Sequence, residues 1–463
     1  MERGSWATCA GLAIHYAAFR AGWIPLWPEA IGEWIMARTP NDWALAILSA
    51  LGEWAKPFAV TGGLAALGFL ATTSALIRGW PMLPAAIALS WGASRFFEYG
   101  SLAGQAAFWA PALAVLLWRP AAVTPNPARR AFLGLLMAGT TGAVAAESFS
   151  RNRAMARRAV DPVELFPFSP PPDTFAPGFV RPAVTSVRDF YLMSKNAVDP
   201  AIDPGSWRLR ITANGRLLWE LSYTELLSAP RIERYSTMRC VSNTLKTNLM
   251  GTALWSGLRM GQLVDPGTLP RDIVEVAFLG VDGHGDSLPL DYGVSDEILL
   301  ALGMNGRTLN RGHGFPIRLV APRYYGFKSV KWLSEIAFVS EPYFGTWPRM
   351  GYTKEPRVHT GSSIDRAVRD GGTVRVGGVS FAGTRGISAV EVRADDGPWH
   401  PAQLDTPLSA ASLTRWYAEI GADPGAREVE ARARDGEGNW QAAEPSPLFP
   451  SGVSGPTRRR ISA

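Results

Sequence analysis

Cys240 is the residue whose type and setting most directly suggest chemistry. It ends the run Tyr235-Ser-Thr-Met-Arg-Cys240 and precedes the polar stretch Val-Ser-Asn243, so we expect it at a strand end entering a turn. A thiolate there would be a soft, anionic metal ligand. By itself, a lone cysteine is also compatible with a small buried hydrophobe. The second cysteine, Cys9, lies in an apolar stretch, and a disulfide between the two is not expected.

A second group of candidate residues lies between His313 and Lys331. His313 is in a glycine-flanked turn, from which its side chain can reach a ligand. Arg318 alternates with apolar neighbours, so it could form an ion pair on a strand face or contact a cofactor. The same two alternatives apply to Lys331. Guanidinium and ammonium groups suit phosphate and other anionic groups. His284, in Asp-Gly-His-Gly-Asp, is expected in a solvated turn rather than in a metal site.

Residues 1–150 have the composition of a membrane anchor. A helix that spans a bilayer needs roughly 20 largely apolar residues. The pattern predicts an α-helical transmembrane bundle of about five helices, placed at 6–24, 57–77, 80–97, 102–118 and 131–148. Because His15 is the only histidine in this part, a bis-histidine haem is not expected within this chain.

A possible export signal precedes the fifth predicted span. Arg129-Arg130-Ala-Phe132-Leu133 resembles a twin-arginine signal. The alternative is that the two arginines flank an ordinary span on its cytoplasmic side, as the positive-inside rule predicts. Either interpretation makes the rest of the chain extracytoplasmic, on a multi-pass protein of the bacterial cytoplasmic membrane. The arginines at 151–158 argue against this topology.

The remainder divides by composition into four stretches. Residues 151–187 are rich in proline and predict an extended linker. Residues 188–355 predict an α+β domain that carries both groups of candidate residues. Residues 356–450 alternate in short runs separated by turn signals, which predicts an all-β sandwich of the Ig type. Residues 451–463 predict a basic tail; together with the arginines at 151–158 it supplies much of the net charge of +6, and nucleic-acid binding is not expected.

Ordered motifs within 185–450 resemble the sulfite oxidase family, in its membrane-anchored bacterial form. Cys240-Val-Ser-Asn243 resembles that family's metal-ligand turn. The other matching segments are Asp203-Pro204 with Trp207-Arg-Leu, Leu254-Trp255-Ser-Gly257, Gly280-Val-Asp282-Gly, Met304-Asn305-Gly306, His313-Gly-Phe-Pro316-Ile-Arg318, Tyr325-Gly326-Phe-Lys328-Ser-Val-Lys331-Trp332, and Thr384-Arg-Gly-Ile387.

The resemblance implies a molybdenum–molybdopterin cofactor and assigns its contacts. Cys240 would ligate the molybdenum, and Tyr352 would be an active-site tyrosine. The residues expected to bind the pterin part are Asn196, Asp282, His313, Arg318, Ser329 and Lys331. Asn196 stands where the family often has histidine.

The implied activity is two-electron oxygen-atom transfer on a small sulfur- or nitrogen-containing substrate. Electrons would pass to or from a separate cytochrome or quinone-linked partner, and the sandwich suggests a possible homodimer. Ser194 and Leu245 stand where sulfite oxidases place substrate arginines, so a sulfoxide reductase is an alternative. A non-catalytic surface module that retains the scaffold is a third reading.

Overall fold

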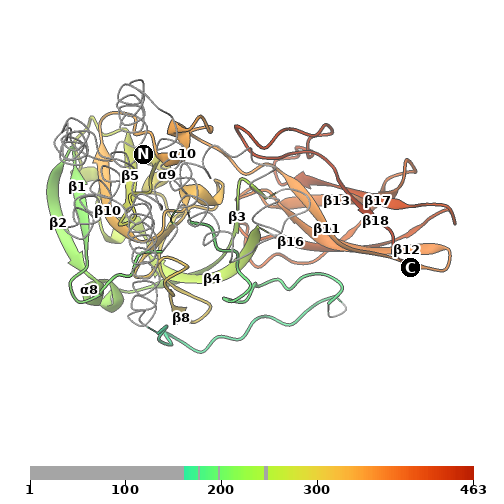
Figure 1. Cartoon of the computed structure of the whole chain (residues 1–463), viewed down its shortest axis with the longest axis horizontal. Coiled ribbons are helices and arrows are strands. Elements are labelled where there is room, and N and C mark those ends of the chain that lie inside the picture. Colours follow the sequence, from blue (N-terminus) through green and yellow to red (C-terminus); the bar gives the residue numbers. More distant parts are fainter. Residues whose placement is uncertain (1–160, 176–177, 195, 197–198, 244–248, 463) are drawn as a thin grey trace, which may run out of the picture. The chain divides into compact units, whose positions relative to one another are not determined.

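The computed structural model describes residues 161–462, apart from 176–177, 195, 197–198 and 244–248 (Figure 1). The five predicted spans, the paired arginines 129 and 130, and the arginines at 151–158 lie outside the described residues. Within the described part of the chain, no helix is both long and apolar enough to cross a membrane. The chain forms two compact units: residues 1–157 with 194–198, and residues 158–193 with 199–463. Everything below concerns the second unit unless stated.

The first sheet of the part before the C-terminal sandwich has the strand order β2-β1-β10-β5-β6. Its strands are β1 (Arg208–Ala213), β2 (Arg216–Ser222), β5 (Glu275–Gly280), β6 (Gly285–Pro289) and β10 (Leu333–Val339). Strands β1 and β10 run parallel, and the other pairs are antiparallel. An Asn214-Gly215 turn joins β1 to β2, with φ values of 47° and 77°. These values suit asparagine and glycine because both tolerate the left-handed region.

The second sheet carries the candidate cysteine. It has the order β3-β4-β7-β8, with β9 also paired to β7. The strands are β3 (Ile232–Arg239), β4 (Met250–Leu258), β7 (Leu299–Met304), β8 (Arg307–Thr308) and β9 (Arg318–Val320). Strand β3 ends immediately before Cys240, so the predicted strand end is confirmed.

The helices of this part are short, which makes it β-rich rather than an even mixture of α and β. They are α8 (Tyr223–Ser228), α9 (Leu290–Gly293) and α10 (Thr346–Arg349), with 3-10 turns at Met260–Gln262, Pro266–Thr268 and Gly326–Lys328. Helix α8 begins directly after strand β2. Ser222 and Glu225 form a reciprocal capping box at its start.

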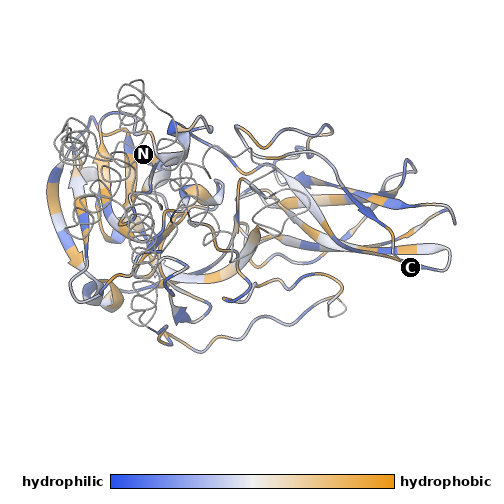
Figure 2. Ribbon diagram, in the orientation of Figure 1, coloured by the Kyte–Doolittle hydropathy of each residue, from blue (hydrophilic) through white to orange (hydrophobic). Residues whose placement is uncertain are grey.

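The C-terminal part is an all-β sandwich that resembles an Ig-like domain. Its two sheets have the orders β11-β12-β16-β15 and β14-β13-β17-β18. Hydrophobic and hydrophilic residues alternate along these strands (Figure 2), so one face of each sheet is buried. The strands are β11 (Gly361–Asp370), β12 (Thr373–Phe381), β13 (Ile387–Ala394), β14 (His400–Pro401), β15 (Gln403–Leu404), β16 (Thr414–Gly421), β17 (Glu428–Asp435) and β18 (Thr457–Arg460).

Two stretches expected to be solvated are instead packed on the domains. In the stretch expected to be a basic tail, β18 pairs with β17, and Arg458 lies 3.2 Å from Glu428. In the proline-rich stretch, Thr308 N–H donates to Val163 O, Val163 N–H donates to Thr308 Oγ1, and Arg181 pairs with Asp365 of β11. The polar groups of these described residues therefore bond to both parts of the chain.

Candidate functional site

The turn after β3 holds Cys240 through backbone hydrogen bonds. The Cys240 N–H donates to Leu249 O at 2.9 Å, and Asn243 N–H donates to Cys240 O at 3.0 Å. Asn243 Oδ1 accepts from Leu249 N at 2.8 Å, which closes the turn. The cysteine is 8% exposed and forms no disulfide. Cys240 is therefore a buried thiol whose backbone is bonded to Leu249 and Asn243.

The surroundings of the thiol combine burial with donors aimed at sulfur. Burial raises the pKa of Cys240, while Ser242, through its backbone N–H and its hydroxyl, opposes that rise. The charge of Arg239 and the N–H of Val241 lower the pKa as well. Without a metal the thiol form is favoured, and a bound cation would favour the thiolate. Ser242 was missed from sequence; a hydroxyl two residues after the cysteine in a polar turn was its only signal.

Arg318 is a buried cation with no carboxylate partner among the described residues. It is 5% exposed, and its guanidinium donates to His313 O at 3.1 Å, Ser329 O at 3.1 Å and Met238 Sδ at 3.3 Å. Its Cζ lies 5.3 Å from the centre of the Trp255 ring. Burial lowers the pKa of Arg318 to about 10, so it stays charged at neutral pH. Because a buried charge without a counter-charge is costly, this position suits an anionic group.

The turn at residues 310–314 brings His313 and Lys331 beside Arg318. His313 Nε2 lies 2.9 Å from Val187 O, so that nitrogen must carry the proton. Lys331 Nζ donates to Gly312 O at 3.0 Å. Gly314 has φ +105°, and a Cβ there would lie 3.0 Å from the Lys331 Cβ and 3.2 Å from the Arg318 Cβ. The close approach of these two cationic residues therefore requires glycine.

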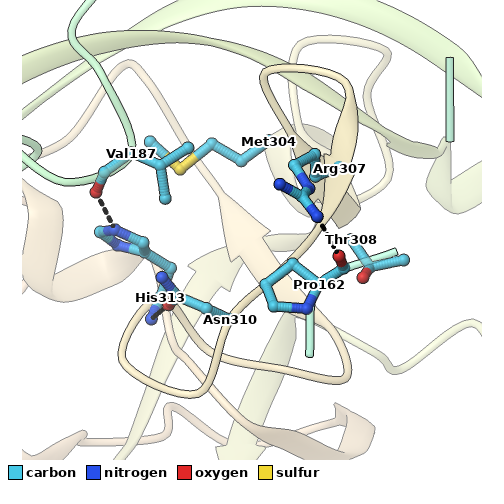
Figure 3. Close-up of a pocket in the computed structure, with 7 residues that line it drawn as sticks. All are labelled: Pro162, Val187, Met304, Arg307, Thr308, Asn310 and His313. Atoms are coloured by element: carbon cyan, nitrogen blue, oxygen red, sulfur yellow. Dashed lines mark hydrogen bonds between the residues drawn. The ribbon is translucent and has the colours of Figure 1, made fainter. Parts of the chain in front are cut away.

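A small cavity opens beside His313 (Figure 3). Its volume is about 140 Å³, and Arg307 on its far side donates to Pro162 O at 2.8 Å. The lining residues come from β7, β8, the 310–314 turn and the proline-rich stretch: Pro162, Val187, Met304, Arg307, Thr308, Asn310 and His313.

Tyr191 joins this group, and sequence reasoning did not single it out. Burial and the nearby Cys240 raise the pKa of its phenol, while Arg318 opposes the rise. A Cβ at Gly326 would lie 2.5 Å from Tyr191 Oη, so the hydroxyl lies against the turn that precedes Ser329. Tyr191 is thus electrostatically coupled to both Cys240 and Arg318. Its position depends on long-range packing, and no local motif marks it.

Ser329, Asp282 and His284 form hydrogen bonds with the backbone around them. Ser329 Oγ accepts from Ala321 N at 3.1 Å. Asp282 Oδ1 accepts from His284 N at 3.1 Å, while His284 Nε2 lies 3.1 Å from Phe327 O, so this histidine is tied to the fold.

Tyr352 and Asn196 are the remaining residues predicted for the site. The Tyr352 ring packs against Phe327, Trp347 and Phe449. Asn196 belongs to the other compact unit, where its N–H donates to Ser194 Oγ at 3.2 Å. The structure therefore joins His313, Arg318, Ser329 and Lys331 directly, with Cys240 linked to Arg318 through Tyr191.

A buried ion pair anchors the segment that carries Ser329 and Lys331. Lys328 Nζ lies 2.7 Å from Asp286 Oδ1, and both side chains are 1% exposed. We expect Lys328→Met to lower the free energy of unfolding by about 3 kcal/mol, because it leaves a buried carboxylate unpaired. Urea denaturation would measure the change. The double variant Lys328→Met with Asp286→Leu should recover most of the loss, and a double variant as unstable as the single one would contradict this account.

His313 predicts a pH dependence of stability. Burial lowers its pKa to about 4, against 6.5 for an ordinary histidine. The unfolded chain therefore binds this proton more readily, so the contribution is complete above pH 6.5 and is lost as the pH falls towards 4. We expect the cofactor-free protein to lose about 3 kcal/mol over this interval from His313 alone. In His313→Gln the corresponding loss in urea denaturation should be smaller by that amount; identical pH profiles would exclude the effect.

Comparisons with known proteins find similarity over this part of the chain. Residues 196–347 match the family described as oxidoreductase molybdopterin binding domain. Human mitochondrial sulfite oxidase is 27% identical over 338 residues, which is 61% of each chain. The uncharacterized oxidoreductase YuiH of Bacillus subtilis is 29% identical over 175 residues, covering 38% of this chain and 86% of that protein. The crystal structure of the sulfane dehydrogenase SoxCD from Paracoccus pantotrophus covers 56% of this chain and 74% of that chain, with 19% identity and a TM-score of 0.49.

The β-rich domain thus combines a buried thiol with an arginine that has no carboxylate partner among the described residues. Residues 196–347 match an oxidoreductase molybdopterin binding domain, and a longer part of the chain is similar to sulfite oxidases. It spans 61% of the length of the human sulfite oxidase that it matches.

Proposed function

We propose that this chain catalyses two-electron oxygen-atom transfer on a small sulfur- or nitrogen-containing substrate and exchanges electrons with a separate redox partner. The observation that carries the proposal is a buried thiol and a buried guanidinium that both act on Tyr191, the guanidinium having no carboxylate partner among the described residues. An anionic pterin dithiolene that holds molybdenum would supply the soft metal for the first and the negative charge for the second.

The protein's own residues would bind and orient the cofactor. Cys240 would ligate the metal, with Ser242 donating to its sulfur. Arg318 and Lys331, held about Gly314, would face the anionic part of the cofactor. Neutral His313 would fix the adjoining turn through Val187 O. Asn196, Asp282 and Ser329 would provide polar contacts to the pterin. Bound molybdopterin would supply the two-electron redox chemistry itself.

A reductive role is the second candidate. Ser194 and Leu245 provide no guanidinium where sulfite oxidases place one, and the neighbouring Lys195 and Lys246 are point charges rather than bidentate forks. A neutral sulfoxide or N-oxide needs no such fork. Tyr352, among the rings of Phe327, Trp347 and Phe449, would then act at the substrate side as a hydrogen-bond donor.

We also propose a membrane location for this chain and two kinds of protein partner. Residues 1–150 would anchor the chain in the bacterial cytoplasmic membrane, with the catalytic domain outside the cytoplasm after twin-arginine export. A cytochrome or a quinone-linked protein would be the electron partner, and the sandwich would support a homodimer.

Metal and pterin analysis tests the class of function. The full chain, expressed in cells that make molybdopterin, should contain about one molybdenum and one pterin per chain. A folded chain that has neither would leave the non-catalytic module as the better account. Parallel assays of sulfite oxidation and sulfoxide reduction would then decide direction; efficient sulfite turnover would refute the argument from Ser194 and Leu245.

A further inference from the structure

The strand that ends at Cys240 is held on its outer edge by the sandwich domain. Strand β3 pairs with β4 on one side. On the other side, Thr237 N–H donates to Ala411 O at 2.9 Å, and Thr237 Oγ1 accepts from Leu413 N at 2.8 Å. Ser409 Oγ donates to Tyr235 O at 2.7 Å. The sandwich loop 409–413 thus occupies an edge that would otherwise be unpaired.

Arg239, the last residue of β3, also contacts the sandwich. Its Nη1 donates to His359 O at 3.2 Å, and its Cζ lies 5.9 Å from the centre of the Tyr325 ring. The residue is 7% exposed, its buried Nε has no hydrogen-bond partner, and no carboxylate of the described chain pairs with it. Side chains alternate along a strand, so Met238 contacts Arg318 on the cofactor side while Arg239 points to the sandwich.

The burial of the Arg239 guanidinium does not increase the stability of the fold. A buried guanidinium with one carbonyl partner and one unsatisfied N–H carries a desolvation cost that its contacts do not offset. An unbranched apolar side chain of similar length would fill the same space at lower cost. The contribution of Arg239 is therefore geometric: it holds the residue directly before Cys240 at a set distance from the sandwich.

We infer that the sandwich domain positions the metal-ligand cysteine, with Arg239 as the positioning residue and the 409–413 loop as the clamp on β3. The inference rests on the proposed function, because it takes Cys240 as the ligand. A metal site tolerates displacements of only about 0.5 Å in its ligands. One planar peptide bond joins Arg239 to Cys240, so a displacement of Arg239 shifts the Cys240 backbone that carries the sulfur.

The test compares Arg239→Met with Arg234→Met, the same substitution on the same strand away from the sandwich, where Arg234 bonds to Asp296 O. The full chain is prepared once from cells that cannot make the cofactor and once from cells that can. Iodoacetamide labelling of Cys240, followed by peptide mass spectrometry, reports how firmly the cysteine is held. In cofactor-free protein we expect labelling to rise about tenfold in Arg239→Met, at a melting temperature within about 2 °C of the unaltered chain. Arg234→Met should label as the unaltered chain does.

A second variant displaces the guanidinium without removing its charge. A Cβ at Gly361 would lie 2.8 Å from Arg239 Nη1, so Gly361→Ala must push that flexible end away. It should raise Cys240 labelling in the same direction, and both variants should lower molybdenum content severalfold in cofactor-producing cells. Labelling and loading unchanged in both variants, with molybdenum present in the unaltered chain, would overturn the inference and leave the proposed function standing. An unaltered chain without molybdenum would instead refute the proposed function, while labelling would still report on the clamp.

Discussion

Replacement of Cys240 by serine is expected to abolish molybdenum retention and to reduce turnover by about three orders of magnitude or more. A serine hydroxyl at this site is a hard, neutral donor, whereas the thiolate is soft and anionic. The two side chains are similar in size, so we expect the cofactor-free protein to unfold within about 1 kcal/mol of the unaltered chain. Molybdenum analysis by mass spectrometry, together with urea denaturation, checks both parts.

The control is Cys9→Ser, which makes the same substitution at the other cysteine of the chain. It should retain its metal. A Cys240→Ser protein that keeps a full complement of molybdenum would show that the thiol is a structural residue and that another group holds the cofactor.

Replacement of Arg318 by methionine should separate cofactor binding from stability. The guanidinium is buried beside Trp255, and within the described residues its acceptors are all neutral, so its removal relieves a charge that has no counter-charge there. We expect the cofactor-free variant to be as stable as the unaltered chain or more stable. We expect affinity for the cofactor to fall about a thousandfold, because truncating one partner of a buried charge pair costs roughly 4 kcal/mol.

Pterin content measured by fluorescence and urea denaturation of cofactor-free protein are the two readouts. Arg318→Lys should recover part of the affinity, because it keeps the charge but not the planar fork. Arg210→Met, at an exposed ion pair with Glu335, serves as the surface control. A large loss of stability in cofactor-free Arg318→Met, with normal pterin content, would show that Arg318 is a structural residue.

Features that depend on a few neighbouring residues could be predicted from sequence. The end of β3 before Cys240, the Asn214-Gly215 hairpin and the capped helix α8 follow from local turn and capping preferences. The family resemblance implied that His313, Arg318 and Lys331 share one site, and the glycine at 314 leaves room for the Arg318 and Lys331 side chains beside that turn.

The residues that sequence reasoning missed depend on partners far along the chain. Tyr191 meets Gly326 across more than a hundred residues, and Arg239 meets His359 across a distance of 120 residues. The residues of β18 were expected to form a basic tail, because three consecutive arginines favour exposure to solvent. Their pairing with β17 and its glutamates could not be inferred from the local charge.

The sequence by itself determined which chemical groups are available: one thiol at a strand end, an arginine among apolar neighbours and a lysine after it. Only the tertiary structure decided that this arginine has no counter-charge within the described residues and that the cysteine strand is clamped by a second domain. The physical reason is that local conformation follows from neighbouring dihedral preferences, whereas burial and charge pairing depend on which distant segments pack together.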